Sequence, residues 1–229
     1  MAATRKPRPR GRPTKPGLNR DLVLSTAIRL ADEEGIEAAS LRRVADALGV
    51  HPTSIYNHVP NKEAIFEGMI EALLVEADLP MDVPDWASWV REFAAAIRRT
   101  ARAHPGAFGV FLRHVATGPI ALRHIEAALD AFCRAGCSLE QAGQAVHGTS
   151  LAVLGLALEE VPVVTATVPP DFALMTPEEH PLIFELEGVG GTMGPSEETW
   201  NLMVESMIAG FAATLPFTKP KREPKPVRR

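Results

Sequence analysis

A row of hydrogen-bonding side chains occupies residues 53 to 58, and their reach suits contacts with nucleic acid. Hydroxyl, phenol, amide and imidazole groups follow one another, interrupted only by Ile55. Such groups exchange hydrogen bonds with base edges in the DNA major groove and also bind phosphate oxygens. The pattern therefore predicts a DNA-reading surface made of Thr53, Ser54, Tyr56, Asn57 and His58.

Two short helices are expected to position this row. Ser40 can cap a helix over residues 41–48, whose apolar side chains recur three and four residues apart. Gly49 tolerates the left-handed backbone that ends a helix, and Pro52 is favoured in the first turn of the next one. With an amphipathic helix over 22–34, these segments predict a three-helix head with a helix-turn-helix.

The run from Ala31 to Met69 resembles the N-terminal domain of the TetR family of bacterial transcriptional repressors. Three phrases match its signature without a gap: Gly49-Val50, Ile55-Tyr56-Asn57-His58-Val59 and Asn61-Lys62-Glu63-Ala64. A generic helical corner would explain the first phrase but not all three in register. The resemblance implies that Tyr56, His58 and Lys62 hold phosphates, while Arg42, Thr53, Ser54 and Asn57 reach bases. With Ser40, these are the DNA-binding candidates of the head.

Charge is distributed unevenly along the chain. Residues 1–20 carry seven basic side chains and no acid, although the formal net charge of the whole chain is -4. Pro9-Arg10-Gly11-Arg12-Pro13 resembles the AT-hook core, so Arg10 and Arg12 are expected in a narrow minor groove. The alternative is a solubilising tail. We expect a disordered basic arm over 1–20 and a disordered basic tail over 216–229.

Composition favours an all-α, cytoplasmic protein that does not enter membranes. No apolar stretch approaches the roughly 20 residues that span a bilayer, and no signal peptide follows the basic start. Cys133 and Cys137 are the only cysteines, and we interpret them as packing residues rather than as a redox or metal pair. The chain shows no nucleophile triad, phosphate loop or His-Glu metal motif, so an enzyme is not expected.

The head is assigned to residues 21–68, and residues 69–215 are expected to form a helical domain for effector binding and dimerisation. Helical patterns cover 86–103, 107–114, 119–136, 139–160 and 197–213, and the stretch over 161–195, rich in Val, Thr, Pro and Gly apart from one short helix, is expected to form a mobile lid. The helix over 139–160 is small or apolar nearly all round, and a helix without a polar face must be buried. We therefore expect it to pack against a copy of itself in a homodimer, together with the last helix.

The C-terminal half also resembles the tetracycline-repressor branch of the family, in phrases such as His114-Val115-Ala116-Thr117-Gly118-Pro119. In that branch, the positions of His114 and Glu159 serve a drug-bound magnesium. Here Phe93 and Leu151 replace polar drug contacts, so neither metal nor cofactor is expected and the effector should be rather apolar. The candidate ligand-binding residues, about half of which could be ordinary core, are Trp89, Phe93, Ile97, His104, Phe108, Phe111, His114, Thr117, His147 and Leu151.

These features predict a homodimeric transcriptional repressor that binds a near-palindromic operator in double-stranded DNA. A small molecule in the helical domain would release it. The alternative is an architectural DNA-binding protein without an effector, which would explain the basic arm but leave the large C-terminal domain without a role.

Overall fold

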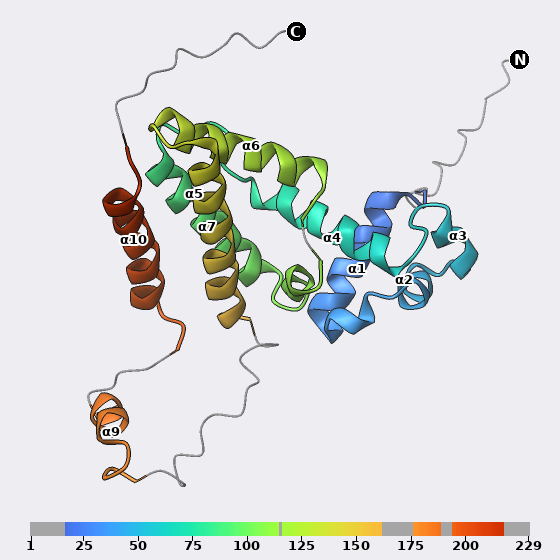
Figure 1. The fold of residues 1–229 in the computed structure, drawn as a ribbon. Coiled ribbons are helices and arrows are strands. Elements are labelled where there is room, and N and C mark those ends of the chain that lie inside the picture. The colour runs from blue at the N-terminus through green and yellow to red at the C-terminus, as the bar shows by residue number, and fades with distance from the viewer. Residues whose placement is uncertain (1–16, 115, 162–175, 189–193, 218–229) are drawn as a thin grey trace, which may run out of the picture.

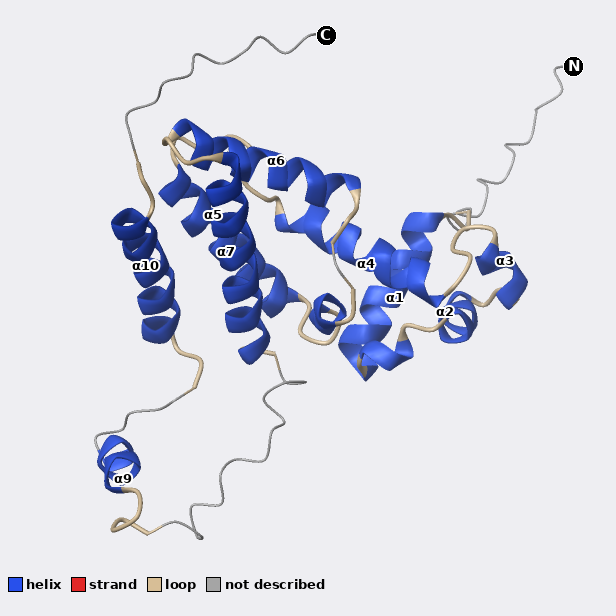
Figure 2. Cartoon of the chain, in the orientation of Figure 1, coloured by secondary structure: helices blue, strands red, loops and turns tan. Residues whose placement is uncertain are grey.

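The computed structural model describes residues 17–114, 116–161, 176–188 and 194–217, and Figures 1 and 2 show only helices and loops within these ranges. The expected all-α class is confirmed. Within this part of the chain, every helix is too short or too polar to traverse a bilayer. The elements are α1 (Arg20–Glu34), η1 (Ile36–Ala38), α2 (Leu41–Leu48), α3 (Pro52–Tyr56), α4 (Lys62–Ala77), α5 (Trp86–Ala103), η2 (Phe108–Leu112), α6 (Pro119–Arg134), α7 (Leu139–Glu159), α9 (Pro181–Gly188) and α10 (Glu197–Thr214).

The helix ends follow from local hydrogen bonding. The side chain of Ser40 accepts from the Arg43 backbone N–H at the start of α2, and Asn61 accepts from the Ala64 N–H at the start of α4. Ser138 begins α7 with a capping box. At the end of α2, Gly49 has a φ of 65°, a left-handed conformation that most other side chains disfavour.

The head consists of α1, α2 and α3, and α4 extends from it into the rest of the molecule (Figure 1). Val44, Ile55 and Val59 are buried, so α2 and α3 are held together by a small apolar contact. The expected domain boundary between residues 68 and 69 falls inside α4. One continuous core runs from the head into the larger domain, and α4 is therefore a rigid connection between them.

The larger domain, here called the body, packs α5, α6, α7 and α10 against one another, with α5 and α7 side by side (Figure 1). Aromatic rings hold this packing together: Trp86 on α5 stacks on Phe217 with ring centroids 4.6 Å apart and also contacts Phe132 on α6. The body is thus a closely packed helical unit around a shared apolar core.

Two elements differ from the sequence prediction. The helix expected over 107–114 is the 3-10 helix η2, which closes in one short turn after the loop that contains Pro105 and Gly106. Helix α3 ends at Tyr56, so Asn57 is its C-cap and His58 lies just beyond. The basic arm with Arg10 and Arg12, most of the basic tail and much of the predicted lid over 161–195 lie outside the described residues.

Candidate DNA-binding surface and effector region

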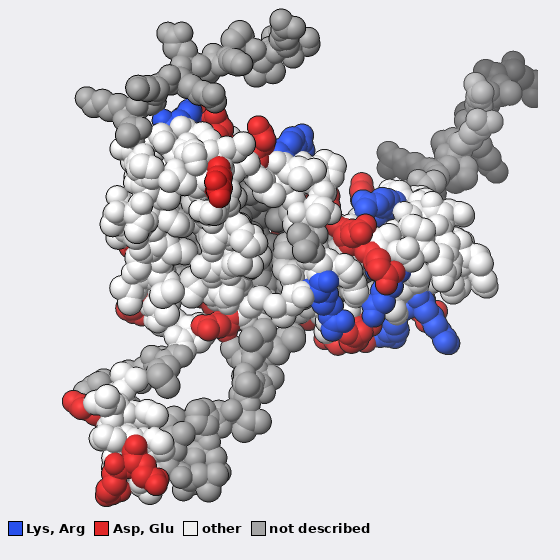
Figure 3. Space-filling view, in the orientation of Figure 1, with Lys and Arg blue, Asp and Glu red and all other residues white. Residues whose placement is uncertain are grey.

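Helix α3 exposes polar side chains and buries one apolar side chain, that of Ile55. Ile55 is fully buried, whereas Thr53, Tyr56 and Asn57 are exposed, with Tyr56 at 51%. Ser54 and His58 are half-buried. In the view of Figure 3, the end of the head that carries α3 is mostly uncharged, with basic and acidic side chains beside it on the same head. The arrangement suits hydrogen bonding to base edges flanked by attraction to phosphates.

The residues around α3 are partly engaged within the chain. Arg42 is exposed on α2, while its neighbour Arg43 is paired with Glu34. Lys62 Nζ lies 3.0 Å from Glu37 Oε2 and 5.2 Å from the ring centroid of Phe66. The hydrogen bond from Lys62 and the nearby Arg113 lower the pKa of Glu37. A DNA phosphate that binds Lys62 must therefore compete with Glu37.

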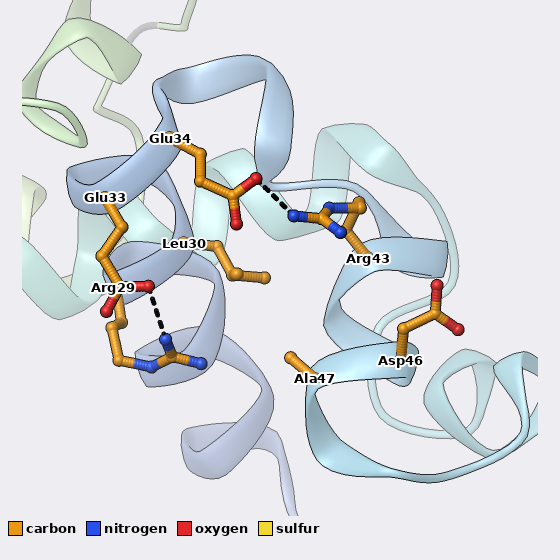
Figure 4. A pocket seen from close by; sticks show the side chains of 7 residues that line it. All are labelled: Arg29, Leu30, Glu33, Glu34, Arg43, Asp46 and Ala47. Carbon is orange, nitrogen blue, oxygen red and sulfur yellow. Dashed lines mark hydrogen bonds and ion pairs between the residues drawn. The ribbon is translucent and has the colours of Figure 1, made fainter.

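A pocket of about 340 Å³ lies between α1 and α2 in the head (Figure 4). Two ion pairs occupy most of its charged lining: Arg29 with Glu33 at 2.7 Å, and Arg43 with Glu34. Such a lining does not suit a rather apolar effector. The pocket is a polar groove where α1 and α2 meet in the head.

The loop after α5 joins the body to the head. His104 Nδ1 lies 2.7 Å from Asp32 Oδ2 at the end of α1, and His104 Nε2 lies 3.1 Å from Glu76 Oε1 on α4. Burial alone would lower the pKa of His104, but the hydrogen bonds to both carboxylates raise it. The other Asp32 oxygen accepts from the Gly106 and Ala107 N–H groups. His104, a candidate ligand residue, is thus placed at the joint between head and body.

Gly106 is required at this joint because the backbones approach too closely for a side chain. A Cβ at Gly106 would lie 2.1 Å from the Ala31 carbonyl oxygen. The salt bridge between Arg113, after η2, and Glu37, at 2.6 Å, adds a second contact to the head. The end of α1 is therefore attached directly to the body, in addition to the connection through α4.

Three of the candidate ligand residues are brought together inside the body. Trp89, Phe93 and Ile97 are all buried on α5. Trp89 and Phe93 stack with ring centroids 5.2 Å apart and an interplanar angle of 5°. His124 of α6, which the sequence analysis missed, stacks on both rings. Its place on a stripe with Ala121 and Ala128 was the available signal.

The remaining candidates are distributed over other surfaces. Phe108 and Phe111 contact each other at 5.0 Å, and His114 packs on Phe66 of α4 at 5.2 Å. Thr117 lines a groove of about 290 Å³ between α1, α4 and the start of α6. His147 and Leu151 lie on the exposed side of α7 in the single chain, with Leu151 at 61% exposure. The structure therefore does not gather these residues around the α5 stack.

No cluster of metal-ligating side chains forms in the part of the chain that is described. His114 packs against an aromatic ring, and Glu159 is exposed at the end of α7. The sequence analysis also missed a partly buried ionic cluster in which Arg98 of α5 contacts Glu160, after α7, and the exposed Glu197 of α10. An arginine within an apolar helix stripe was the only local indication of it.

The acidity of His124 follows from its surroundings. Burial lowers its pKa to about 4, although its hydrogen bond to the Pro80 carbonyl acts in the opposite direction. The unfolded chain therefore binds a proton between pH 6.5 and 4 that the folded chain does not. Stability is fully present above pH 6.5 and decreases as the pH falls towards 4.

We expect His124→Phe to remove this pH dependence. Because one pKa unit corresponds to about 1.4 kcal/mol, the wild type should lose about 3 kcal/mol between pH 7 and 4 through this group. Urea unfolding at several pH values measures the slope. An equally steep slope in His124→Phe would contradict the assignment.

A helix-turn-helix head attached through one long helix to a larger helical body defines the class of DNA-binding regulators with a separate sensory domain. Residues 23–69 match the family described as bacterial regulatory proteins, tetR family, and residues 79–214 match the tetracyclin repressor-like C-terminal domain. The chain belongs to the TetR family of transcriptional regulators, which are not enzymes.

Several characterised proteins are similar to this chain. An HTH-type transcriptional regulator of Saccharopolyspora erythraea is 35% identical over 54% of this chain and 52% of its own length, so this match spans about half of that relative. The class E tetracycline repressor protein of Escherichia coli is 29% identical over 86% of this chain and 92% of its own. ActR of Streptomyces coelicolor in complex with actinorhodin superposes with a TM-score of 0.73 at 25% identity, covering 88% and 99% of the two chains.

Proposed function

We propose that this protein is a cytoplasmic homodimeric repressor that binds a near-palindromic operator and is released by a small, rather apolar ligand in its body. The observation that carries the proposal is α3, a short helix with a buried Ile55 and exposed Thr53, Tyr56 and Asn57. The relatives support it, because tetracycline repressors and an ActR complex with actinorhodin are among them.

A route for coupling the two domains runs along α4. This helix begins at Lys62, beside the proposed DNA surface, and reaches the start of α6 at Glu71. Glu71 Oε1 accepts from the Ile120 N–H at 2.9 Å, and a Cβ at Gly118 would lie 2.0 Å from Glu71 Oε2. A displacement of α6 must therefore move α4 or break this contact. Two recognition helices about 34 Å apart would lose their match to the DNA grooves if α4 moved.

Sequence readout tests the DNA part of the proposal. Arg42→Ala should cost about 1 to 3 kcal/mol on the specific operator and relax the preference at one position in each half-site, because a base contact is lost. Lys62→Ala should weaken all sequences to a similar extent, because a phosphate contact carries no sequence information. Titration against a selected operator and against scrambled DNA separates the two effects. Unchanged specificity in Arg42→Ala would exclude that residue from base recognition.

The alternative, an architectural DNA-binding protein without an effector, predicts a different result in the same assay. Such a protein would bind scrambled DNA about as well as any selected site, and its affinity would fall steeply with salt. A specific regulator keeps a large affinity ratio between operator and scrambled DNA at physiological salt. The ratio therefore decides between the two functions without knowledge of the ligand.

A further inference from the structure

His51 is an exposed residue of the head that the proposed function leaves unused. It lies between the glycine turn that ends α2 and Pro52, the first residue of α3. Its Nδ1 lies 2.9 Å from Thr53 Oγ1 and accepts from the Thr53 backbone N–H at 3.4 Å. The imidazole therefore caps α3, a role that short polar side chains usually have.

The capping contact fixes the tautomer of His51. A backbone N–H can only donate, so Nδ1 is an acceptor and carries no hydrogen. The single ring hydrogen is then on Nε2. Nε2 has no hydrogen-bond partner among the residues that the structure describes, and the residue is exposed. The ring thus offers one hydrogen-bond donor to a partner outside the chain.

The same contact fixes the role of the Thr53 hydroxyl. Because Nδ1 of His51 carries no hydrogen, the hydrogen between the two side chains comes from Thr53 Oγ1. The exposed hydroxyl oxygen then has only lone pairs left for a further partner, so it is an acceptor. Two side chains that contact each other therefore present a donor and an acceptor next to each other.

The backbone around His51 is held in place by hydrogen bonds. The Val50 N–H donates to the Ala45 carbonyl at 3.0 Å, and Gly49 has the left-handed conformation of the turn. The Ser54 N–H donates to the His51 carbonyl at 2.9 Å. Val50 also packs against the core of the chain. The donor and the acceptor are therefore positioned before DNA binds, and little conformational entropy is lost on contact.

The position of His51 favours contact with a base rather than with a phosphate. Helix α3 lies at the end of the head that points away from the body (Figure 1). The first residues of a recognition helix contact base edges in the major groove, whereas the preceding helix crosses the DNA backbone. A neutral imidazole is also a weaker partner for a phosphate than a charged side chain is.

Adenine has the complementary edge. In the major groove it presents the N7 acceptor beside the N6 amine, a donor, and an Asn or Gln amide recognises this edge with two hydrogen bonds. The donor of His51 and the acceptor of Thr53 together offer the same two groups. Guanine presents two acceptors, N7 and O6. The Thr53 hydroxyl could donate to O6 only by breaking its hydrogen bond to His51.

We propose that His51 and Thr53 together read one adenine in each half-site of the operator. His51 Nε2 donates to adenine N7, and Thr53 Oγ1 accepts from the adenine N6 amine. The inference rests on the proposed function and deepens it, because it makes His51 a specificity-determining residue and names the base that it selects.

Binding-site selection from random DNA with the full chain tests this inference. The wild type should select adenine at one position of each half-site. His51→Ser and Thr53→Val should relax that preference about tenfold and leave the other positions unchanged, because each variant removes one of the two hydrogen bonds. Serine also caps helices well, so His51→Ser should hardly change the melting temperature. If His51 only capped α3, this variant would keep the adenine preference.

The contact atom is tested with 7-deazaadenine, in which a carbon replaces N7, at the selected position of the operator. This substitution should weaken wild-type binding about tenfold, since the acceptor for His51 is lost. His51→Ser should bind the two operators equally well, because its contact with N7 is already absent. Arg42→Ala is the control: it should be as sensitive to 7-deazaadenine as the wild type, since Arg42 is expected at another base.

Three results would overturn the inference. They are an adenine preference that His51→Ser retains, an equal weakening of operator and scrambled DNA in His51→Ser, as for a phosphate contact, and wild-type binding that is indifferent to 7-deazaadenine. None of them affects the proposed function, provided that the wild type still selects an operator from random DNA. A wild-type protein that selects no sequence would instead refute the proposed function.

Discussion

Replacing Gly148 by leucine is expected to convert the proposed homodimer into a monomer without unfolding the chain. A Cβ at Gly148 or at Gly155 meets no atom within 4 Å in the single chain, so the extra side chain has space there. The two glycines are seven residues apart, which puts them on one face of α7 together with Leu151, 61% exposed. An exposed apolar face with small residues suits a closely packed helix of a second copy.

The effect on DNA binding should be as large as that on assembly. A leucine in a closely packed helix pair forces the helices apart, and a monomer offers only one recognition helix to a two-part operator. Light scattering measures the mass, and a gel shift measures operator affinity. Ala95→Leu, at an exposed position on α5, is the matched control and should remain dimeric. An intact dimer for both the Gly148 and Gly155 variants would place the interface elsewhere.

Local patterns predicted the helices well because their ends depend on neighbouring residues. Ser40, Asn61 and Ser138 cap the helices that follow them through hydrogen bonds three residues away. The outward face of α3 was predictable for a similar reason, because a single apolar residue, Ile55, divides a polar run. These features need no knowledge of distant segments.

Contacts between distant segments could not be predicted in this way. His104 suggested a ligand contact, but its partners Asp32 and Glu76 come from α1 and α4, 72 and 28 residues earlier. His124 joins the Trp89 stack only because α6 packs on α5. A lone histidine on a buried helix stripe does not identify its neighbours, so the composition of the effector region needed the structure.

The other large effect is expected at the cluster of Arg98, Arg102, Glu160 and Glu197, which joins α5, the end of α7 and the start of α10. Arg98 Nε donates to Glu160 Oε1 at 2.7 Å, and its guanidinium lies 4.4 Å from the ring centroid of Trp200. The side chains of Arg98 and Glu160 are only 9% and 8% exposed. Arg98→Met should therefore cost about 3 kcal/mol of unfolding free energy, the lower end for breaking a buried pair, because the Glu160 carboxylate loses Arg98 and keeps only its hydrogen bonds from Arg102.

The pH dependence of the unfolding free energy should also change in Arg98→Met. Burial alone would raise the pKa of Glu160, but hydrogen bonds from Arg98 and Arg102 lower it overall. In the wild type this group contributes stability above pH 4.5, its ordinary value, and the contribution is lost as the pH falls below that. Without Arg98 the burial effect is less opposed, so the acid loss of stability should begin at a higher pH. Urea unfolding between pH 7 and 3 measures both changes.

A control links the same two helices at the surface. Arg91 of α5 pairs with Glu205 of α10 at 2.7 Å, with side chains 49% and 55% exposed. Water screens such a pair, so Arg91→Met should cost far less than Arg98→Met. The double variant Arg98→Met with Glu160→Met should regain part of the loss, because the buried carboxylate is removed together with its buried partner. Equal costs for Arg91→Met and Arg98→Met would show that burial of the cluster does not hold α10 in place.

Since α10 is expected in the dimer interface, Arg98→Met should also weaken dimerisation if the cluster positions this helix.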